Sequence, residues 1–259
     1  MLFILSGEGP TDIGGPNGTA RHDSGDLLYP LEEWKSGPMA HFVNEMCKES
    51  SIDAFNPALG CKAFFVPETN LTEKAKLIRN QSRGFSGQGN GQHYHTKCAF
   101  VLATLAAEKK QQEGNSDTVV IFFRDCDGTR STPQNRYTDL KESMKRGFER
   151  ARGEIFCVPM IPKPKSEAWL LCALKASPYH NCTPIEERSG NDRSPNSLKE
   201  ELKSLIEVMG RPYNAETLVD MIISDSCPPI QPNRIDMPSW NDFKQDLKEA
   251  LDSTGFRNL

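Results

Sequence analysis

Short apolar runs alternate with longer amphipathic stretches over the first two thirds of the chain. Four of these runs predict buried strands, at residues 2–6, 61–67, 118–123 and 154–160. Apolar residues at helical spacing predict helices at 38–50, about 95–112 and about 133–152. Strands that alternate with helices indicate an α/β fold with a mostly parallel sheet flanked by helices.

The pattern becomes helical beyond residue 165. Helices are predicted at 166–174, 196–209, 214–224 and 239–253, with proline-rich loops between them. We therefore expect an α/β domain at 1–164 and a helical C-terminal extension at 165–259. Trp169, Trp240 and Phe243 are expected to pack inside this extension.

The composition is that of an ordinary globular protein. Of the 259 residues, 37% are hydrophobic and 25% are charged, and the net charge is −4. The longest apolar runs are too short to span a bilayer, and the first residues lack the pattern of a signal peptide. Eight cysteines without a CxxC pair fit reduced thiols. These features predict a cytoplasmic protein that does not bind membranes.

Acidic residues follow two of the predicted strands. The stretch IFFRDCDGT carries Asp125 and Asp127 at i, i+2, which places both carboxylates on one face of an extended chain. Glu8 follows the first strand, in GEGPTD. Ligands of parallel sheets bind beyond the carboxyl ends of the strands. Three carboxylates at such an edge are the hard oxygen ligands that Mg²⁺ or Mn²⁺ prefers.

These two motifs together resemble the Toprim family. The family pattern is a glutamate after the first strand and a DxD after a later strand, and Glu8, Asp125 and Asp127 match it as catalytic metal ligands. The continuation MIPKPKSEAWLL is similar to small stand-alone Toprim-like proteins, so the resemblance covers about residues 1–175. The long segment 7–37 departs from the family pattern and leaves the roles of residues such as Asp12, His22, Asp23 and Asp26 open.

The resemblance implies a Mg²⁺-dependent nuclease that cleaves phosphodiesters of DNA or RNA. The chain shows no room for a tyrosine-bearing breakage domain, no zinc ribbon and no GxxxxGK[ST] motif. It is thus similar to the Toprim part of overcoming-lysogenization-defect nucleases without their ATPase. Stand-alone versions resemble effectors of bacterial anti-phage systems, in which a separate ATPase protein supplies the regulation.

Other charged residues near these motifs have two interpretations each. Glu167 could complete a second metal site or act as a general base, or it could simply complement the helix dipole. Lys163 and Lys165 could bind phosphate or be plain loop charges. Arg83 and Lys97 lie beside the glycine-rich loop 84–91, which could follow a nucleic-acid backbone.

Further basic residues favour structural roles. Arg124 precedes the DxD by one position, so it should point to the opposite face of the strand and form a salt bridge. A basic helix follows, with Lys141, Lys145, Arg146 and Arg150, and the simplest interpretation is a solvated helix surface.

Two rival functions remain open. The run into DxDGT also resembles the first motif of haloacid-dehalogenase-type phosphatases, in which Asp125 would be the nucleophile and Asp127 the general acid. Against it, two strands precede the motif, no later strand ends in an aspartate pair, and Glu8 has no role. The other rival is a non-catalytic subunit that binds nucleic acid or a protein partner.

Overall fold

A computed structural model describes residues 1–18, 27–78, 90–126, 136–224 and 230–255, and of residues 90–93 the backbone alone. The strands are β1 (Leu2–Gly7), β2 (Gly14–Pro16), β3 (Tyr29–Pro30), β4 (Trp34–Ser36), β5 (Lys62–Pro67), β6 (Thr118–Phe123) and β7 (Phe156–Met160). The helices are α1 (Pro38–Lys48), α2 (Glu68–Leu77), α3 (Asn90–Gln112), α4 (Arg136–Arg150), α5 (Ser166–Leu174), α6 (Leu198–Val208), α7 (Ala215–Ile223) and α8 (Pro238–Ser253).

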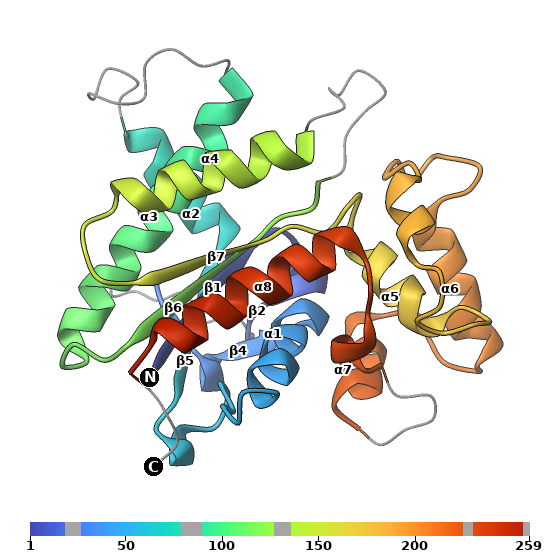
Figure 1. The fold of residues 1–259 in the computed structure, drawn as a ribbon, viewed down its shortest axis with the longest axis horizontal. Coiled ribbons are helices and arrows are strands. Elements are labelled where there is room, and N and C mark those ends of the chain that lie inside the picture. Colours follow the sequence, from blue (N-terminus) through green and yellow to red (C-terminus); the bar gives the residue numbers. More distant parts are fainter. Residues whose placement is uncertain (19–26, 79–89, 127–135, 225–229, 256–259) are drawn as a thin grey trace.

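A five-stranded sheet forms the centre of the molecule, in the order β3-β5-β1-β6-β7 (Figure 1). β1 pairs in parallel with β5 and β6, and β6 pairs in parallel with β7, whereas the short β3 runs antiparallel to β5. The predicted α/β fold with a mostly parallel sheet is therefore confirmed. Gly7 lies opposite Phe123 in the β1–β6 pair, so Glu8 and Arg124 leave the sheet at the same edge.

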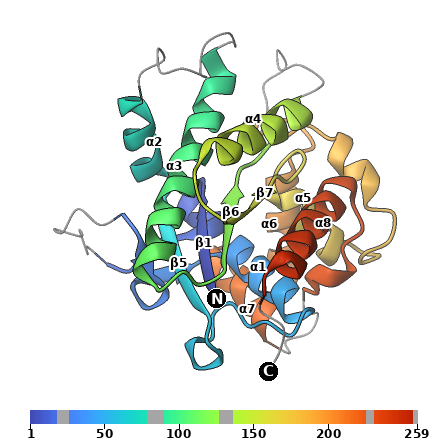
Figure 2. The same ribbon diagram turned by 60° about the vertical axis from the view of Figure 1, so that its left-hand side comes forward.

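Helices cover both faces of this sheet, and Figure 2 separates α2 and α3 on one side from α1 and α8 on the other. Alternate residues of β1 serve the two faces: Leu2 and Ile4 pack with α2, α3 and α4, and Phe3 and Leu5 pack with α1, α5 and α8. Burial on both faces explains why the strands are continuous apolar runs rather than alternating ones.

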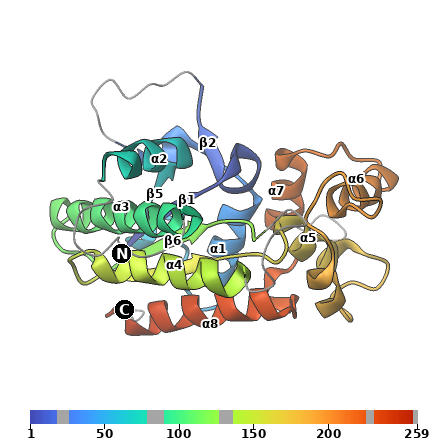
Figure 3. The same ribbon diagram turned by 90° about the horizontal axis from the view of Figure 1, so that it is seen from above.

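The C-terminal helices pack against the sheet through aromatic side chains. The rings of Trp169 in α5 and Trp240 in α8 meet edge to face, 4.7 Å between centroids, and Phe42 of α1 contacts Trp240 at 5.4 Å. The predicted packing role of Trp169, Trp240 and Phe243 is thus confirmed. Figure 3 shows α5, α6 and α7 gathered beyond one end of the sheet. Whether residues 165–259 form a separate domain stays a prediction.

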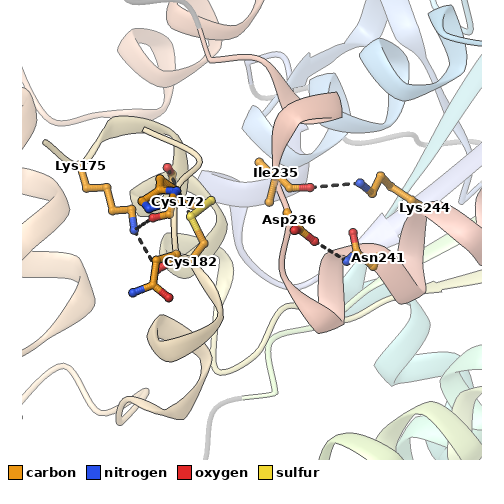
Figure 4. The surroundings of a disulfide bond; sticks show 9 residues. Cys172, Lys175, Cys182, Ile235, Asp236, Asn241 and Lys244 are labelled. Carbon is orange, nitrogen blue, oxygen red and sulfur yellow. Dashed lines mark hydrogen bonds between the residues drawn. A yellow bond between two sulfur atoms is a disulfide. The ribbon is translucent and has the colours of Figure 1, made fainter. Parts of the chain in front are cut away.

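The expectation that all cysteines are reduced is wrong for one pair. Cys172 and Cys182 form a disulfide, with Cα atoms 5.4 Å apart (Figure 4). The chain turns back after α5 because Tyr179 and Asn181 adopt positive φ angles of 63° and 53°. The Tyr179 backbone N–H donates to the Cys172 carbonyl at 2.7 Å and holds this turn closed. Sequence spacing alone does not reveal such a turn.

The segment 7–37 also has more structure than a long loop. It contains the antiparallel pair β2–β4 and a π-helical turn at Gly9–Ile13. The Trp34 indole N–H donates to the Ile13 carbonyl at 3.1 Å and the Gly37 N–H donates to the same oxygen at 3.0 Å. Over the described ranges, no helix is both long and apolar enough to cross a membrane.

Candidate functional site

The site lies where β1 and β6 end side by side. A Cβ on Gly7 would come within 2.7 Å of the Phe123 Cβ, so glycine lets the two strand ends approach closely. Gly9 has a φ of 79°, which favours glycine, and the chain then passes through the Gly9–Ile13 turn. This turn brings Asp12 back toward the end of β6.

Arg124 occupies one side of this edge. Its Nε lies 2.8 Å from Glu8 Oε2, and its guanidinium also pairs with Glu68, the first residue of α2. Glu68 in addition accepts a hydrogen bond of 3.0 Å from the Tyr94 hydroxyl. Burial lowers the pKa of Arg124, but the carboxylates of Glu8 and Glu68 outweigh it and raise that pKa above its usual value. The predicted salt bridge of Arg124 is confirmed, and one of its two partners is the candidate metal ligand Glu8.

Asp125 occupies the other side and faces the start of α5. Its Oδ1 accepts a hydrogen bond of 2.9 Å from the Ser166 backbone N–H. The Ser166 hydroxyl donates to Asp12 Oδ1 at 2.6 Å, and it lies 3.4 Å from Glu167 Oε2. Ser166 therefore joins the carboxylates of Asp12, Asp125 and Glu167 into one group, which we call the carboxylate cluster.

The cluster carries more negative charge than its surroundings balance. Asp125 and Glu167 are buried, at 7% and 8% exposure. Burial first, and then repulsion from Asp12, Glu167 and Glu8, raises the pKa of Asp125 well above its usual value. Burial also raises the pKa of Asp12 and the pKa of Glu167, against smaller opposing effects of Ser166 and Lys165 respectively. These carboxylates would all be stabilised by an added cation or proton.

The nearest positive charge is shared with a further acid. Lys165 is buried, and its Nζ lies 2.7 Å from Asp192 Oδ1 and 3.8 Å from Glu167 Oε2. Burial, with help from Glu167 and Asp12, also raises the pKa of Tyr213, which follows α6. The C-terminal helical segment thus supplies the far wall of the cluster.

The other predicted phosphate contacts that the structure describes are Lys163 and Lys97, and both are engaged within the protein. Lys163 pairs with Glu187 at 2.8 Å, and both side chains are substantially exposed, at 35% and 73%. Lys97 donates to the Ile78 carbonyl at 2.8 Å, at the end of α2. Asp127 and Arg83 lie outside the described residues.

The basic helix predicted at 133–152 is α4, and its lysines pair with α8. Lys141 Nζ lies 3.1 Å from Asp242 and 3.0 Å from Asp246, and Lys145 lies 3.5 Å from Asp246. These lysines hold α4 to α8, which agrees with a structural role better than with a nucleic-acid surface.

The donor atoms of the cluster fit a hard divalent cation in kind, since carboxylate and hydroxyl oxygens are what Mg²⁺ prefers. In the part of the chain that the structure describes, no three His, Cys, Asp or Glu side chains are placed closely enough to enclose a metal ion. Mg²⁺ is ordinarily held by one or two carboxylates, with waters and phosphate oxygens completing its shell. Asp12 and Asp125, which both accept hydrogen bonds from Ser166, would be the two carboxylates of such a site.

Asp12 and Ser166 are the members of the cluster to which sequence reasoning gave no role. Asp12 stands four residues after Glu8 in the same GEGPTD motif, and Ser166 directly precedes Glu167. The position of Asp12 within the GEGPTD motif was therefore the sequence signal that could have identified it as a site residue. No family model matches the chain, and neither the curated proteins nor the solved structures contain a significant match to it.

Proposed function

We propose that this protein is a Mg²⁺- or Mn²⁺-dependent nuclease that hydrolyses phosphodiester bonds of DNA or RNA. The observation that supports it most is the convergence of Asp12, Asp125 and Glu167 on Ser166 at the carboxyl edge of the parallel sheet. Their pKa values are all raised. Acids whose pKa values are strongly raised by burial and by neighbouring charges cluster at functional sites.

Asp12 and Asp125, together with Glu8 after β1 and Asp127 of the DxD motif, are the residues that would hold the metal. The metal would supply an activated water and neutralise charge that builds on the phosphoryl oxygens. Ser166 fixes both ligands, because its N–H orients Asp125 and its hydroxyl orients Asp12. Arg124 fixes Glu8 in the same way from the other side.

Glu167 and the two lysines have different roles in this proposal. A raised pKa suits Glu167 to accept a proton from water near neutral pH. Lys165 is buried between Glu167 and Asp192, so it balances charge within the protein. Among the described residues the Lys163 ammonium pairs with Glu187 at the surface, and an ion pair of this kind contributes little stability and exchanges readily for a phosphate. Of the two, Lys163 is therefore the better candidate for contact with substrate.

The Toprim resemblance and the role of a partner belong to this proposal as well. A glutamate and a DxD on adjacent parallel strands are the Toprim arrangement, and β1 and β6 are adjacent here. By analogy with stand-alone members of that family, we infer an effector of bacterial anti-phage defence whose cleavage a separate ATPase controls.

A cleavage assay tests the proposal. The wild type, Glu8→Ala, Asp125→Asn and Asp127→Asn are incubated with plasmid DNA, single-stranded DNA and tRNA in Mg²⁺, Mn²⁺ or EDTA. Glu207→Ala on the exposed surface of α6 is the matched control. We expect metal-dependent cleavage of a polymer that Glu207→Ala retains and the three site variants lose by at least about 100-fold.

The same assay separates the rivals. A small phosphomonoester is included as a further substrate, and turnover of that compound alone, with no effect of Glu8→Ala, would identify a phosphatase. Absence of polymer cleavage both alone and with the ATPase partner supplied would contradict the nuclease proposal.

A further inference from the structure

A pocket of about 520 Å³ lies between the Gly9–Ile13 turn, the β2–β4 pair and α7. Its apolar wall on α7 consists of Ala215, Val219 and Ile223, whose spacing of four residues places them on one face of the helix. Pro10 and Pro16 contribute from the N-terminal segment. Ile223 is 55% exposed although it is a large apolar residue. The pocket therefore offers uncovered apolar surface to a ligand.

The polar lining residues are Lys35 and Ser36 on β4 and Glu216 and Asp220 on α7, and Asp220 is paired with Arg211. Ser36 lines the pocket, and its Oγ is buried with no hydrogen-bond partner among the described residues. Leaving a buried hydroxyl without a partner is costly, and a ligand can supply one after rotation about χ1. Lys35 and Glu216 form an ion pair at the rim, with side chains 61% and 70% exposed. Apolar walls with a few polar groups are the usual construction of small-molecule sites, and the volume falls in their usual range.

The pocket and the carboxylate cluster share one structural element. Pro10 lies in the pocket wall and Asp12 lies in the cluster, both within the Gly9–Ile13 turn. Gly37 lines the pocket and packs on the other side of this turn, since a Cβ at Gly37 would come 2.3 Å from the Asp12 carbonyl oxygen. A ligand in the pocket would therefore contact the Gly9–Ile13 turn, which also carries Asp12.

We propose that this pocket binds a nucleobase of the nucleic-acid substrate next to the bond that is cut. The inference rests on the proposed function. A phosphodiester bound at the carboxylate cluster carries a base on its neighbouring nucleotide, and the pocket adjoins the turn that carries Asp12. The flat faces of a base suit the proline and aliphatic walls. Its polar edge suits the Ser36 hydroxyl, and Lys35 can bind the adjoining phosphate.

Nucleoside binding tests the pocket without requiring catalysis. Saturation-transfer NMR in EDTA measures the binding of adenosine, guanosine, cytidine, uridine and thymidine. Val219→Trp fills the pocket, and Val208→Trp places the same ring on the exposed face of α6, where Val208 is 87% exposed. Ser36→Ala removes only the hydroxyl. Circular dichroism and melting temperatures confirm that each variant is folded.

We expect saturable binding of at least one nucleoside by the wild type, with a Kd below about 1 mM. Val208→Trp should bind equally, Val219→Trp at least about tenfold more weakly, and Ser36→Ala about fivefold more weakly, as the loss of one hydrogen bond implies. No saturable binding by the wild type, or equal binding by Val219→Trp, would overturn the inference.

The Asp125→Asn variant separates this inference from the nuclease proposal. It should lose polymer cleavage and keep wild-type nucleoside binding, because its side chain lies in the cluster and not in the pocket. A wild type that binds nucleosides and cleaves no polymer supports the pocket and contradicts the nuclease. A wild type that cleaves polymers but binds no nucleoside supports the nuclease proposal and contradicts the pocket inference.

Discussion

Replacement of Asp125 by asparagine should stabilise the metal-free protein. Asp125 Oδ1 lies 2.9 Å from Ser166 N, and Asp12 Oδ1 lies 2.6 Å from Ser166 Oγ. The two serine atoms are under about 4 Å apart, which puts the two carboxylate oxygens no more than about 9.5 Å from one another. Two unit charges at that separation repel by about 2 kcal/mol at an effective dielectric constant of about 20. The amide oxygen of the introduced asparagine can still accept the Ser166 hydrogen bond, so little is lost.

The expected gain is smaller than this repulsion, because Asp12 is half-buried and solvent screens part of its charge. We expect Asp125→Asn to raise the free energy of unfolding by about 1–2 kcal/mol in EDTA at pH 8. For a chain of this size that corresponds to a melting temperature about 3–6 °C higher. Asp252→Asn, at an exposed position on α8, should change stability by less than about 0.5 kcal/mol.

The pH dependence of this gain has a definite sign. The folded-state pKa of Asp125 is raised, so the folded protein binds the proton more tightly than the unfolded chain. The wild type therefore loses stability as pH rises from about 4 toward the folded-state pKa, and the variant does not. The difference between the two proteins should close as pH falls toward about 4.

Differential scanning fluorimetry over this pH range, with and without Mg²⁺, measures the effect. Added Mg²⁺ should stabilise the wild type more than the variant. A variant that is less stable than the wild type at pH 8 in EDTA would refute the idea that these carboxylates repel one another.

Three further predictions concern the scaffold. Gly147→Ala should lower the free energy of unfolding, measured by urea denaturation, by about 2 kcal/mol, because its Cβ would lie 2.3 Å from the Thr96 carbonyl oxygen where α4 crosses α3. Alanine normally favours helices over glycine, so an increase in stability would show that the two helices can move apart without cost. Reduction of the Cys172–Cys182 disulfide should lower the free energy of unfolding by about 3 kcal/mol, because the unfolded chain regains the entropy that the closed loop removes. A melting temperature that reductant does not change would contradict this. Arg124→Gln should lower the free energy of unfolding by about 2 kcal/mol in the same urea assay, since it removes the positive charge that Glu8 and Glu68 share. A neutral result would mean that these ion pairs contribute nothing.

The main elements could be predicted from sequence because their apolar patterns are strong. TVVIFF is a continuous apolar run and forms β6, and SEAWLLCAL forms α5 at the predicted residues. α2 was missed because it buries only Leu71 and Ala75 within ETNLTEKAKL, too few positions for a helical period. β2 and β4 have three residues each and cannot show a pattern.

The site could be predicted in part for the same reason. Glu8 and Asp125 follow strands, so the topology of a parallel sheet places them at one edge. Asp12 joins Asp125 only because Trp34 and Gly37 hold the Gly9–Ile13 turn in place. Contacts of this kind join residues far apart in the chain, and a single sequence does not record them.

The proposal that the carboxylate cluster holds a divalent cation can be tested directly by measuring metal binding. Isothermal titration calorimetry with Mn²⁺ compares the wild type, Asp125→Asn and the surface control Asp252→Asn. We expect saturable binding by the wild type and the control, weakened at least about 100-fold in Asp125→Asn. Binding should release protons increasingly as pH falls, because carboxylates with a raised pKa must lose their protons to bind a cation. Mn²⁺ binding that Asp125→Asn retains in full, or no binding by the wild type, would contradict it.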